Sequence, residues 1–275
     1  MTQRIVTGAL MLIALTGLML LGGWYFAVGA LIAVTLCIYE ELRALRAHGH
    51  HPVAWTSYAA LYISAPLMMY FSSVVIIPTL SIVSFCVLLV VMRRDEPTLT
   101  DVMVSILPML TLVLPGMCLF GILDTPLRRM QAMLLTLVFA IAVGGDTFAL
   151  FVGTWIGGKK LCPRISPHKT VSGAIGGLLG SVLMAWLVGY LFMRYLPTQA
   201  FPPMWSILAL GLIGGIAAQM GDLFASMVKR HCVIKDFGNL FPGHGGMLDR
   251  MDSILFSAII VYSYRVVVMT YYLPA

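Results

Sequence analysis

The stretch from Gly221 to Ser253 reads GDLFASMVKRHCVIKDFGNLFPGHGGMLDRMDS. Only 10% of the residues in the 275-residue chain are charged, yet this stretch is dense in charge. Its charged residues are Asp222, Lys229, Arg230, Lys235, Asp236, Asp249, Arg250 and Asp252. Ionisable groups are costly in apolar surroundings, so their concentration in such a chain predicts a site of chemistry.

The composition of the whole chain indicates the class of protein. The chain is 60% hydrophobic with a mean hydropathy of +0.96, whereas soluble domains are about 45–50% apolar and about 25% charged. Long apolar runs, rather than short alternating strands, favour helices over a membrane barrel. The five cysteines are scattered without the pair spacing of a metal site. The sequence therefore predicts an all-α integral membrane protein.

Nine apolar runs long enough to cross a membrane follow one another along the chain. They are Ile5–Leu21, Trp24–Tyr39, Val53–Tyr70, Val74–Val91 after a break near Ser72, Val104–Leu123, Met133–Ile156, Val171–Met193, Ser206–Ala225 and Ile254–Tyr272. Pro108 and Pro115 are expected to kink the fifth run. Residues 1–130 then form an N-terminal transmembrane region of about five spans, and residues 131–275 form a C-terminal catalytic region with its motif loops.

The basic residues predict how the chain lies in the membrane. With the N-terminus on the cytoplasmic side, the inner connections carry thirteen of the seventeen Lys and Arg residues, in keeping with the positive-inside rule. The C-terminus then lies on the outer side, and both polar motif regions face the cytoplasm. The expected location is the cytoplasmic (inner) membrane, with the active site on its cytoplasmic side.

The polar segment from Glu40 to His51 is interpreted as a loop. It begins with two glutamates and ends with three closely spaced histidines, His48, His50 and His51. Histidine-rich tracts can bind metal. A solvated loop is the simpler interpretation, and it is the one adopted from the sequence.

Asp222 follows a nearly uncharged run and lies near its cytoplasmic end. If that helix continues, Ser226 and Lys229 lie on the same face at i+4 and i+7. A carboxylate there needs a positive partner, either a metal ion or a basic side chain. The alternative is that Asp222 only ends a helix at the membrane interface.

The loop Pro242–Gly246 cannot be regular helix, because it contains proline and three glycines. Consecutive N–H groups in such a loop can form an anion-binding concavity. The last run follows at once, with Asp249, Arg250 and Asp252 in the first turn of its helix. Both carboxylates could simply offset the helix dipole. The convergence of Asp222, basic residues and the glycine loop favours chemistry instead.

A second polar group lies earlier in the chain. Asp146 is inside the apolar run Met133–Ile156, where a carboxylate indicates function, with a structural hydrogen bond as the alternative. Ser166, Lys169 and Thr170 precede a glycine-rich run and could contact phosphate at the helix N-terminus. Thr170 could equally be an N-cap. The small-xxx-small spacing of the glycines in that run indicates close helix packing.

Acidic and basic groups together suit a reaction at phosphate. Carboxylates bind Mg²⁺ through oxygen, while Lys and Arg neutralise phosphate charge. Phosphoryl and nucleotidyl transfer depend mainly on positioning and charge neutralisation, so no serine or cysteine nucleophile is needed. The sequence therefore predicts transfer of a phosphorus group with a metal ion.

The motifs resemble those of the CDP-diacylglycerol synthases, also called phosphatidate cytidylyltransferases. The C-terminal signature of that family appears here, at the family's spacing, as Ser226, Lys229-Arg230, Lys235-Asp236, Pro242 to Gly246 and Asp249-Arg250-Met251-Asp252. The Asp146 region and Ser166-Pro167-His168-Lys169-Thr170 resemble a second block of the family. Ser172, Phe148 and Leu150 depart from residues common in that block. The resemblance is close in the C-terminal half and extends to the N-terminal half only in hydropathy.

The resemblance implies a reaction in which phosphatidic acid and CTP give CDP-diacylglycerol and pyrophosphate. It implies Mg²⁺ as cofactor, held by Asp222 and Asp249, with K⁺ as a candidate second cation. The expected catalytic residues are Asp222, Asp249, Lys229, Arg230, Lys235, Asp252 and Asp146. The expected substrate- and phosphate-binding residues are Ser166, Lys169, Thr170, Ser226, His244, Gly245, Gly246 and Arg250, where His244 has a loop-structuring role as its alternative.

The expected partners are CTP and phosphatidic acid in the membrane, and no nucleic acid is expected. Whether the protein forms a homodimer is left open by the sequence. The nearest alternative functions are a CTP-dependent lipid kinase and a cytidylyltransferase for another lipid phosphate, such as an isoprenoid phosphate. An ion-coupled transporter is more remote, because its polar groups are expected near the bilayer midplane. Here the dense motif lies at one interface.

Overall fold

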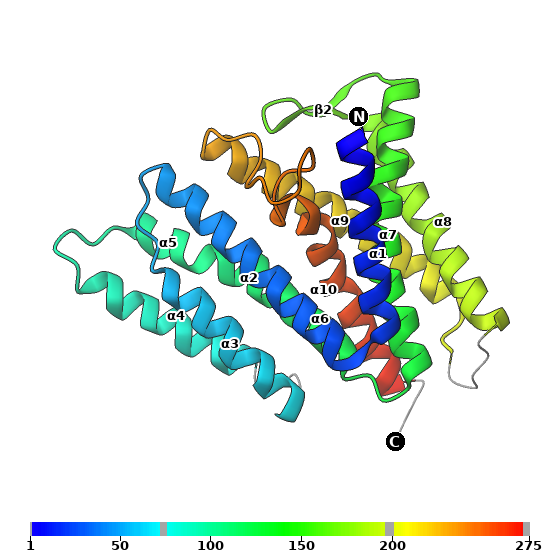
Figure 1. Ribbon diagram of the computed structural model, residues 1–275, viewed down its shortest axis with the longest axis horizontal. Coiled ribbons are helices and arrows are strands. Elements are labelled where there is room, and N and C mark those ends of the chain that lie inside the picture. The colour runs from blue at the N-terminus through cyan, green and yellow to red at the C-terminus, as the bar shows by residue number, and fades with distance from the viewer. Residues whose placement is uncertain (1, 72–75, 196–200, 272–275) are drawn as a thin grey trace. The chain divides into compact units, whose positions relative to one another are not determined.

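The computed structural model describes residues 2–71, 76–195 and 201–271 (Figure 1). The predicted break near Ser72 and the predicted span ends Val74 and Tyr272 lie outside these residues. The helices are α1 (Thr2–Leu21), α2 (Gly23–Ala47), α3 (Ala54–Phe71), α4 (Ile76–Met92), α5 (Leu99–Pro108), the π-helix η2 (Met109–Val113), α6 (Leu114–Leu123), α7 (Arg128–Ile156), α8 (Val171–Tyr195), α9 (Met204–His231) and α10 (Leu248–Tyr271). Two short strands, β1 (Lys160–Cys162) and β2 (Ser166–Thr170), complete the described elements.

The helical membrane fold predicted from the apolar runs is confirmed. Among the described residues, six helices are long and apolar enough to cross a membrane. They are Gly23–Ala47, Leu99–Leu123, Arg128–Ile156, Val171–Tyr195, Met204–His231 and Leu248–Thr270. Shorter apolar helices cover Val6–Leu21 and Ile76–Met92. The count of nine spans and the orientation in the membrane stay predictions.

The loop interpretation is wrong for residues 40–47, because α2 continues to Ala47. The sequence after Tyr39 reads EELRALRA, which consists of strong helix formers without glycine or proline. Glu40 and Glu41 are buried, so charge did not mark the end of the helix. A buried carboxylate needs hydrogen-bond donors or a positive charge beside it. The donors to Glu40 lie in the stretch Gly221–Ser253.

The fifth predicted run is longer and less regular than its hydropathy suggests. It begins at Leu99, where the side chain of Thr98 caps the helix by accepting the N–H of Asp101 at 3.1 Å. Directly after Pro108 the helix changes to π geometry over Met109–Val113. Proline removes a helix hydrogen bond, and a π segment is one way for a helix to absorb that loss.

The chain divides into two compact units. The first contains residues 1–124 and 229–251, and the second contains residues 125–228 and 252–275. The unit boundaries pass through α9, after Val228, and through α10, after Met251. The predicted catalytic region 131–275 therefore contributes residues to both units.

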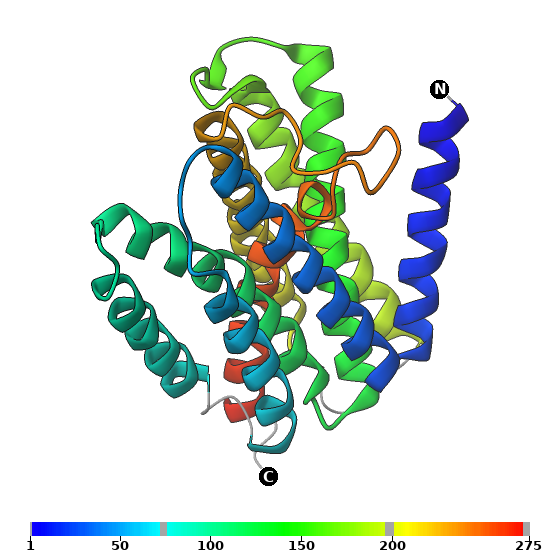
Figure 2. The same ribbon diagram turned by 60° about the vertical axis from the view of Figure 1, so that its left-hand side comes forward.

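In the first unit, α3 packs along α4, and α2 packs against α3 and α6 (Figure 1). The approach of α2 to α6 is close at Gly116, where a Cβ atom would come within 2.9 Å of the Val34 side chain. Gly22 and Gly23 join α1 to α2 with φ angles of 59° and 48°, which glycine adopts at little cost. Beyond this turn α1 diverges from α2 (Figure 2).

In the second unit, α7 and α8 pack along most of their length, which confirms the prediction from the glycine spacing. A Cβ atom at Gly173 would come within 2.8 Å of the Ala149 carbonyl oxygen, and one at Gly176 within 2.5 Å of Val152. A Cβ atom at Gly180 would meet Phe148 in the same way. The missing side chains let the two backbones approach closely.

The segment between α7 and α8 forms a hairpin, in which β1 pairs antiparallel with β2. From the sequence, Gly157 to Thr170 is expected only to be a polar and basic connection. Thr170 ends β2, and its hydroxyl accepts the N–H of Gly173 at 3.1 Å. The N-cap alternative for Thr170 is thus observed. The hairpin therefore leads directly into the capped start of α8.

Candidate active site

The carboxylate of Asp249 is the centre of the site in the first unit. It is buried in the first turn of α10, and its Oδ1 forms an ion pair with Lys229 Nζ at 2.8 Å. Its Oδ2 accepts the N–H groups of Phe237 at 2.8 Å and Gly246 at 2.9 Å. A carboxylate at a helix N-terminus is favoured by the helix dipole. The three contacts satisfy the carboxylate oxygens of Asp249 in a buried position.

Lys229 balances the charge of Asp249 from the last turn of α9. Its side chain is only 13% exposed, and its ammonium group lies 5.5 Å from the centroid of the Phe237 ring. An ammonium group over an aromatic face gains a further electrostatic attraction. Lysine has three N–H donors, so Lys229 can bind a further anion while it holds Asp249.

Glu40 is a member of the site that the sequence analysis missed. From α2, it accepts the N–H of Met247 at 3.0 Å and of Leu248 at 2.8 Å. A Cβ atom at Gly246 would collide with its carboxylate oxygens, so glycine is needed there. The guanidinium of Arg43, also on α2, donates to the carbonyl oxygen of Phe237 at 2.7 Å. α2 therefore contacts the segment between α9 and α10 (residues 232–247, the motif loop) and the start of α10.

A signal for Glu40 was present in the sequence. Two adjacent glutamates follow an apolar run with no helix-breaking residue between, and carboxylates inside an apolar helix indicate function by default. Glu41, the second of them, is buried against Thr111, whose hydroxyl donates to it at 3.3 Å. Nothing in the sequence showed that Glu40 contacts residues more than 200 positions later.

The glycine loop adopts a tight turn. Phe241 N–H donates to the carbonyl of Gly245 at 2.9 Å, and His244 N–H donates to the carbonyl of Phe241 at 2.8 Å. Gly243 and Gly245 have φ angles of 78° and 82°, in the region that favours glycine. The N–H groups of residues 246–248, which follow the turn, donate to the carboxylates of Asp249 and Glu40. The chain's own carboxylates thus occupy this part of the predicted anion-binding concavity.

His244 lies half-buried within the loop. Its Nδ1 atom is buried and has no hydrogen-bond partner among the described residues. A buried polar atom without a partner costs free energy. The side chain therefore has a hydrogen-bonding position that is unfilled among the described residues.

The connection from α9 into the motif loop is fixed by its backbone. Ile234 N–H donates to the carbonyl of Lys229 at 2.9 Å, and Val233 N–H donates to that of Arg230 at 3.2 Å. This pattern is a Schellman-type helix end, with Val233 at φ 55° where glycine is usual. The chain therefore turns sharply at Val233, shortly after Lys229, the residue that pairs with Asp249.

The second unit contains its own acid–base pair. Lys169 on β2 and Asp222 on α9 form an ion pair through Nζ and Oδ2, and their side chains are 27% and 28% exposed. The structure thus joins the two polar regions that the sequence analysis treated separately. The ion pair engages one carboxylate oxygen, whereas a carboxylate offers about four acceptor positions. Asp222 can accept further contacts.

The other predicted residues occupy varied positions. Ser226 and Asp252 are buried, and Ser253 N–H donates to Oδ1 of Asp252 at 2.7 Å. Ser166 is half-buried on β2. The exposed residues of the predicted set are Asp146 on α7, Arg230 at the end of α9, Lys235 in the motif loop and Arg250 on α10. Of the predicted residues, ion pairs join Lys229 to Asp249 and Lys169 to Asp222.

Comparison with known proteins places this arrangement in a family. The sequence profile described as "Cytidylyltransferase family" matches residues 2–268. The chain is 32% identical over 305 residues to the phosphatidate cytidylyltransferase of Synechocystis, covering 98% of this chain and 97% of that protein. It is 39% identical over 144 residues to the phosphatidate cytidylyltransferase of Bacillus subtilis, covering 51% of each chain.

A shorter alignment with higher identity is found with the phosphatidate cytidylyltransferase of Brucella abortus. It reaches 44% identity over 125 residues, or 46% of this chain and 44% of that protein. The family profile and the near full-length relative both extend through the N-terminal half, where the sequence motifs gave no resemblance beyond hydropathy. The chain belongs to the cytidylyltransferase family.

Proposed function

We propose that the protein transfers CMP from CTP to phosphatidic acid in the membrane, giving CDP-diacylglycerol and pyrophosphate. The observation that carries this proposal is the match over 98% of the chain to a phosphatidate cytidylyltransferase. The two lysine–aspartate pairs support it, because phosphate chemistry needs positive charge for the phosphates and carboxylates for a cation.

The proposed reaction is a displacement at phosphorus. An oxygen of the phosphatidic acid phosphate attacks the α-phosphorus of CTP and forms a new P–O–P linkage. The bond between the α-phosphorus and the oxygen that bridges to the β-phosphorus breaks, and pyrophosphate leaves with that electron pair. A phosphate monoester is already largely ionised near pH 7, so no protein group has to remove a proton from the nucleophile.

The basic residues of the motif stretch have the role of binding phosphate in this proposal. Lys229 holds its position through Asp249 and keeps donors for a phosphate oxygen. Arg230, Lys235 and Arg250 are exposed near it in the sequence and add positive charge. The unused Nδ1 of His244 suits a further phosphate contact.

Mg²⁺ is the proposed cofactor, with Asp222 and Asp249 as its carboxylate ligands and K⁺ as a proposed second cation. When bound, Mg²⁺ neutralises charge that develops on the phosphate oxygens. The two carboxylates differ in how much free energy it costs to separate each from its lysine so that it can bind a cation. The Lys169–Asp222 pair is partly exposed, and such pairs are worth only about 0–1 kcal/mol, so a cation can displace Lys169 at little cost. Breaking the buried Lys229–Asp249 pair costs roughly 3–5 kcal/mol, so Asp249 binds a cation while it still contacts Lys229.

An exchange of partners follows from this arrangement. With CTP and Mg²⁺ bound, Asp222 would hold the cation and Lys169 would hold a phosphate group, in place of the ion pair between them. Positive and negative charges stay balanced throughout, which lowers the cost of desolvating each group. Lys169 is thereby a phosphate-binding residue that is held ready by an ion pair.

The proposed location is the inner membrane, with the motif stretch on the cytoplasmic side. The distribution of basic residues along the chain supports this orientation. CTP is supplied from the cytoplasm, and phosphatidic acid reaches the protein within the membrane.

The test is product analysis with the purified full-length protein, CTP and phosphatidic acid in lipid vesicles. We expect CDP-diacylglycerol and pyrophosphate in equal amounts, and loss of both when Mg²⁺ is removed with a chelator. Asp249→Asn and Asp222→Asn are expected to lower turnover by more than about hundredfold, the scale seen when a group that stabilises transition-state charge is removed.

The matched control is Asp95→Asn, which changes an exposed aspartate in a loop far from the motif in sequence. It should retain wild-type turnover. Wild-type turnover in Asp249→Asn or Asp222→Asn would remove that residue from the proposed metal site. Formation of CDP in place of pyrophosphate would identify a lipid kinase.

A further inference from the structure

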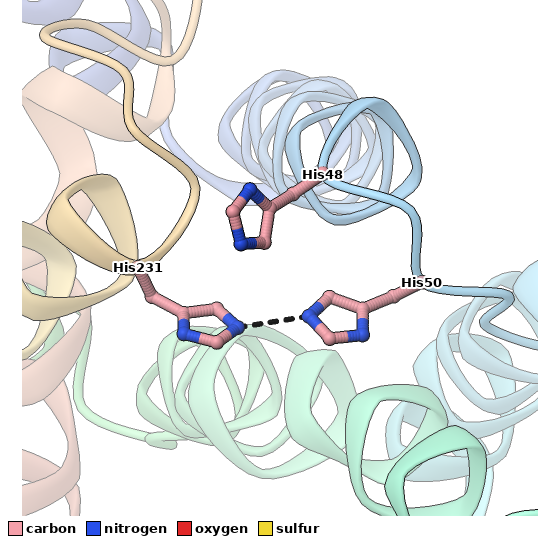
Figure 3. A group of neighbouring side chains, drawn as sticks. All are labelled: His48, His50 and His231. Carbon is pink, nitrogen blue, oxygen red and sulfur yellow. Dashed lines mark hydrogen bonds between the residues drawn. The ribbon is translucent and has the colours of Figure 1, made fainter.

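Three histidines from two separate segments gather outside the proposed active site. His48 caps the C-terminus of α2, His50 follows it by two residues, and His231 is the last residue of α9 (Figure 3). Each offers one ring nitrogen, and the three nitrogens lie within 4.8 Å of one another. The sequence pattern had instead grouped His48 and His50 with His51. All three clustered residues belong to the first compact unit.

The local chain geometry aims the three rings at one point. Gly49 has a φ angle of 88°, so the backbone turns between His48 and His50, and both side chains point toward His231 (Figure 3). The ring centroids are 5.6 Å apart for His48 and His50, and 5.0 and 5.1 Å from each of these to His231. Nε2 of His50 and Nε2 of His231 are 2.8 Å apart and share one hydrogen.

We propose that His48, His50 and His231 form a binding site for one divalent transition-metal ion of the zinc class. Imidazole nitrogen suits Zn²⁺, Cu²⁺ and Ni²⁺, whereas Mg²⁺ and Ca²⁺ require oxygen ligands. The site is therefore chemically distinct from the proposed Mg²⁺ site. Three protein ligands leave one position of a tetrahedral ion open to water or another ligand.

The geometry needs little change to accept such an ion. Zn–N bonds of about 2.0–2.1 Å in a tetrahedron place two ligand nitrogens roughly 3.3 Å apart. The 2.8 Å contact between His50 and His231 would open by about half an ångström as the shared hydrogen is replaced by the ion. The three nitrogens lie within 4.8 Å of one another, so the distances to His48 would close by up to about 1.5 Å.

The surroundings keep the ligands available. His48 and His231 are exposed and His50 is half-buried, so an ion enters directly from solvent.

The ion would link the end of α2 to the end of α9. Along α2, Glu40 binds the start of α10 and Arg43 binds Phe237. His48 and His50 extend this row of contacts to His231, two residues after Lys229. The ion would thus add a third contact between the α2 region and the stretch Gly221–Ser253, beside those of Glu40 and Arg43. We expect the ion to stabilise the position of Lys229. The consequence of this for activity rests on the proposed function.

Metal binding itself is tested without substrate. The full-length protein, made without a polyhistidine tag and stripped with a chelator, is titrated with Co²⁺ as a spectroscopic probe and with Zn²⁺ against a chromogenic chelator. We expect one equivalent to bind, with the visible absorption of tetrahedral Co²⁺. His231→Ala and His50→Ala should weaken Zn²⁺ binding by more than about hundredfold, because loss of even an outer-shell partner costs about 10- to 100-fold.

The matched control is His51→Ala. His51 lies next to His50 but is not a member of the histidine cluster, and its hydrogen bonds within the described residues run through its backbone, from its N–H to Asp101 and from Arg94 to its carbonyl. This variant should bind Zn²⁺ like the wild type, and Zn²⁺ should raise its thermal unfolding midpoint as in the wild type. His231→Gln serves in place of His231→Ala if the latter fails to fold, and Zn²⁺ should not raise its midpoint.

Two results would overturn the proposal. One is the absence of stoichiometric Zn²⁺ and Co²⁺ binding by the wild-type protein. The other is unchanged binding in both His231→Gln and His50→Ala, which would assign the ion to another set of ligands. Because neither measurement uses CTP or lipid, failure here leaves the proposed cytidylyl transfer untouched, and inactivity toward CTP leaves the metal site untouched.

Discussion

The Lys229–Asp249 pair shows how a buried charge is retained in this protein. Two backbone N–H groups and the ammonium group of Lys229 surround the Asp249 carboxylate. Removing one member of a buried pair leaves the other uncompensated, which typically costs about 3–5 kcal/mol. The pair therefore has a structural role in holding the motif loop in addition to its proposed role at phosphate.

This dual role predicts strong coupling between the two residues. Lys229→Met and Asp249→Asn should each lower the free energy of unfolding by roughly 3 kcal/mol, and the double variant should lose clearly less than the sum, by about 1–3 kcal/mol. Thermal or denaturant unfolding of the four proteins in one detergent measures the cycle. Additive losses would show that the two side chains do not interact in the folded protein.

Glu40 leads to a second prediction at the residue scale. Glu40→Ala leaves the N–H groups of Met247 and Leu248 without their acceptor, at a cost of about 1–3 kcal/mol for the buried N–H of Leu248 and less for the half-buried Met247. Glu40→Gln keeps one carbonyl oxygen and should recover part of the loss. Unfolding midpoints check this order, with Glu96→Ala, an exposed glutamate, as the control. Equal midpoints for Glu40→Ala and Glu96→Ala would contradict the anchoring role.

At the level of elements, hydropathy predicted where helices exist better than where they end. The apolar run that begins at Trp24 became α2, but the helix continues through two glutamates to Ala47. Its end is decided by local helix propensity and by partners more than 190 residues away in sequence, such as Phe237 for Arg43. A pattern read along one segment contains no information about such partners.

The hairpin between α7 and α8 was missed for a different reason. β1 has three residues and β2 has five, including Pro167. Strands this short carry too few residues for an alternating pattern, and proline disfavours a strand except at an edge. The motif at Lys169 was recognised, but its pairing with Asp222 depends on the hairpin and could not be predicted.

The packing of α7 on α8 gives the prediction at this scale. Gly176→Ala places a Cβ atom against Val152, and overpacking of this kind costs about 1–3 kcal/mol. Gly17→Ala, on α1, meets nothing within 4 Å and should be neutral or slightly stabilising. Unfolding midpoints compare the two variants, and Val152→Ala should restore part of the stability lost in Gly176→Ala. A neutral Gly176→Ala would argue against the close packing of these helices.

At the scale of the whole molecule, the sequence predicted the type of reaction more fully than the division of the chain into compact units. The motif residues alone indicated a membrane enzyme acting at phosphate, and the family comparison agrees with that conclusion. The division of the chain into two compact units was not predictable, because its boundaries fall inside α9 and α10. Hydropathy treats each of these helices as one segment, whereas long-range packing assigns their ends to different units.

The distribution of site residues between the units also explains what sequence reasoning left open. Asp249 and Lys229 belong to one unit, and Asp222 and Lys169 to the other. Each aspartate has its own lysine partner within its own unit. The sequence suggested a set of shared basic residues, and it could not assign individual partners because pairing depends on tertiary contacts.

The central claim, transfer of CMP to a lipid phosphate, is tested most directly by the fate of labelled phosphorus. The purified protein is given phosphatidic acid and CTP labelled either at the α- or at the γ-phosphorus, and the lipid fraction is counted. The α label is predicted to enter the lipid with one pyrophosphate released for each lipid labelled, while the γ label stays in the aqueous fraction. Entry of the γ label into the lipid, or no entry of either label, would contradict cytidylyl transfer.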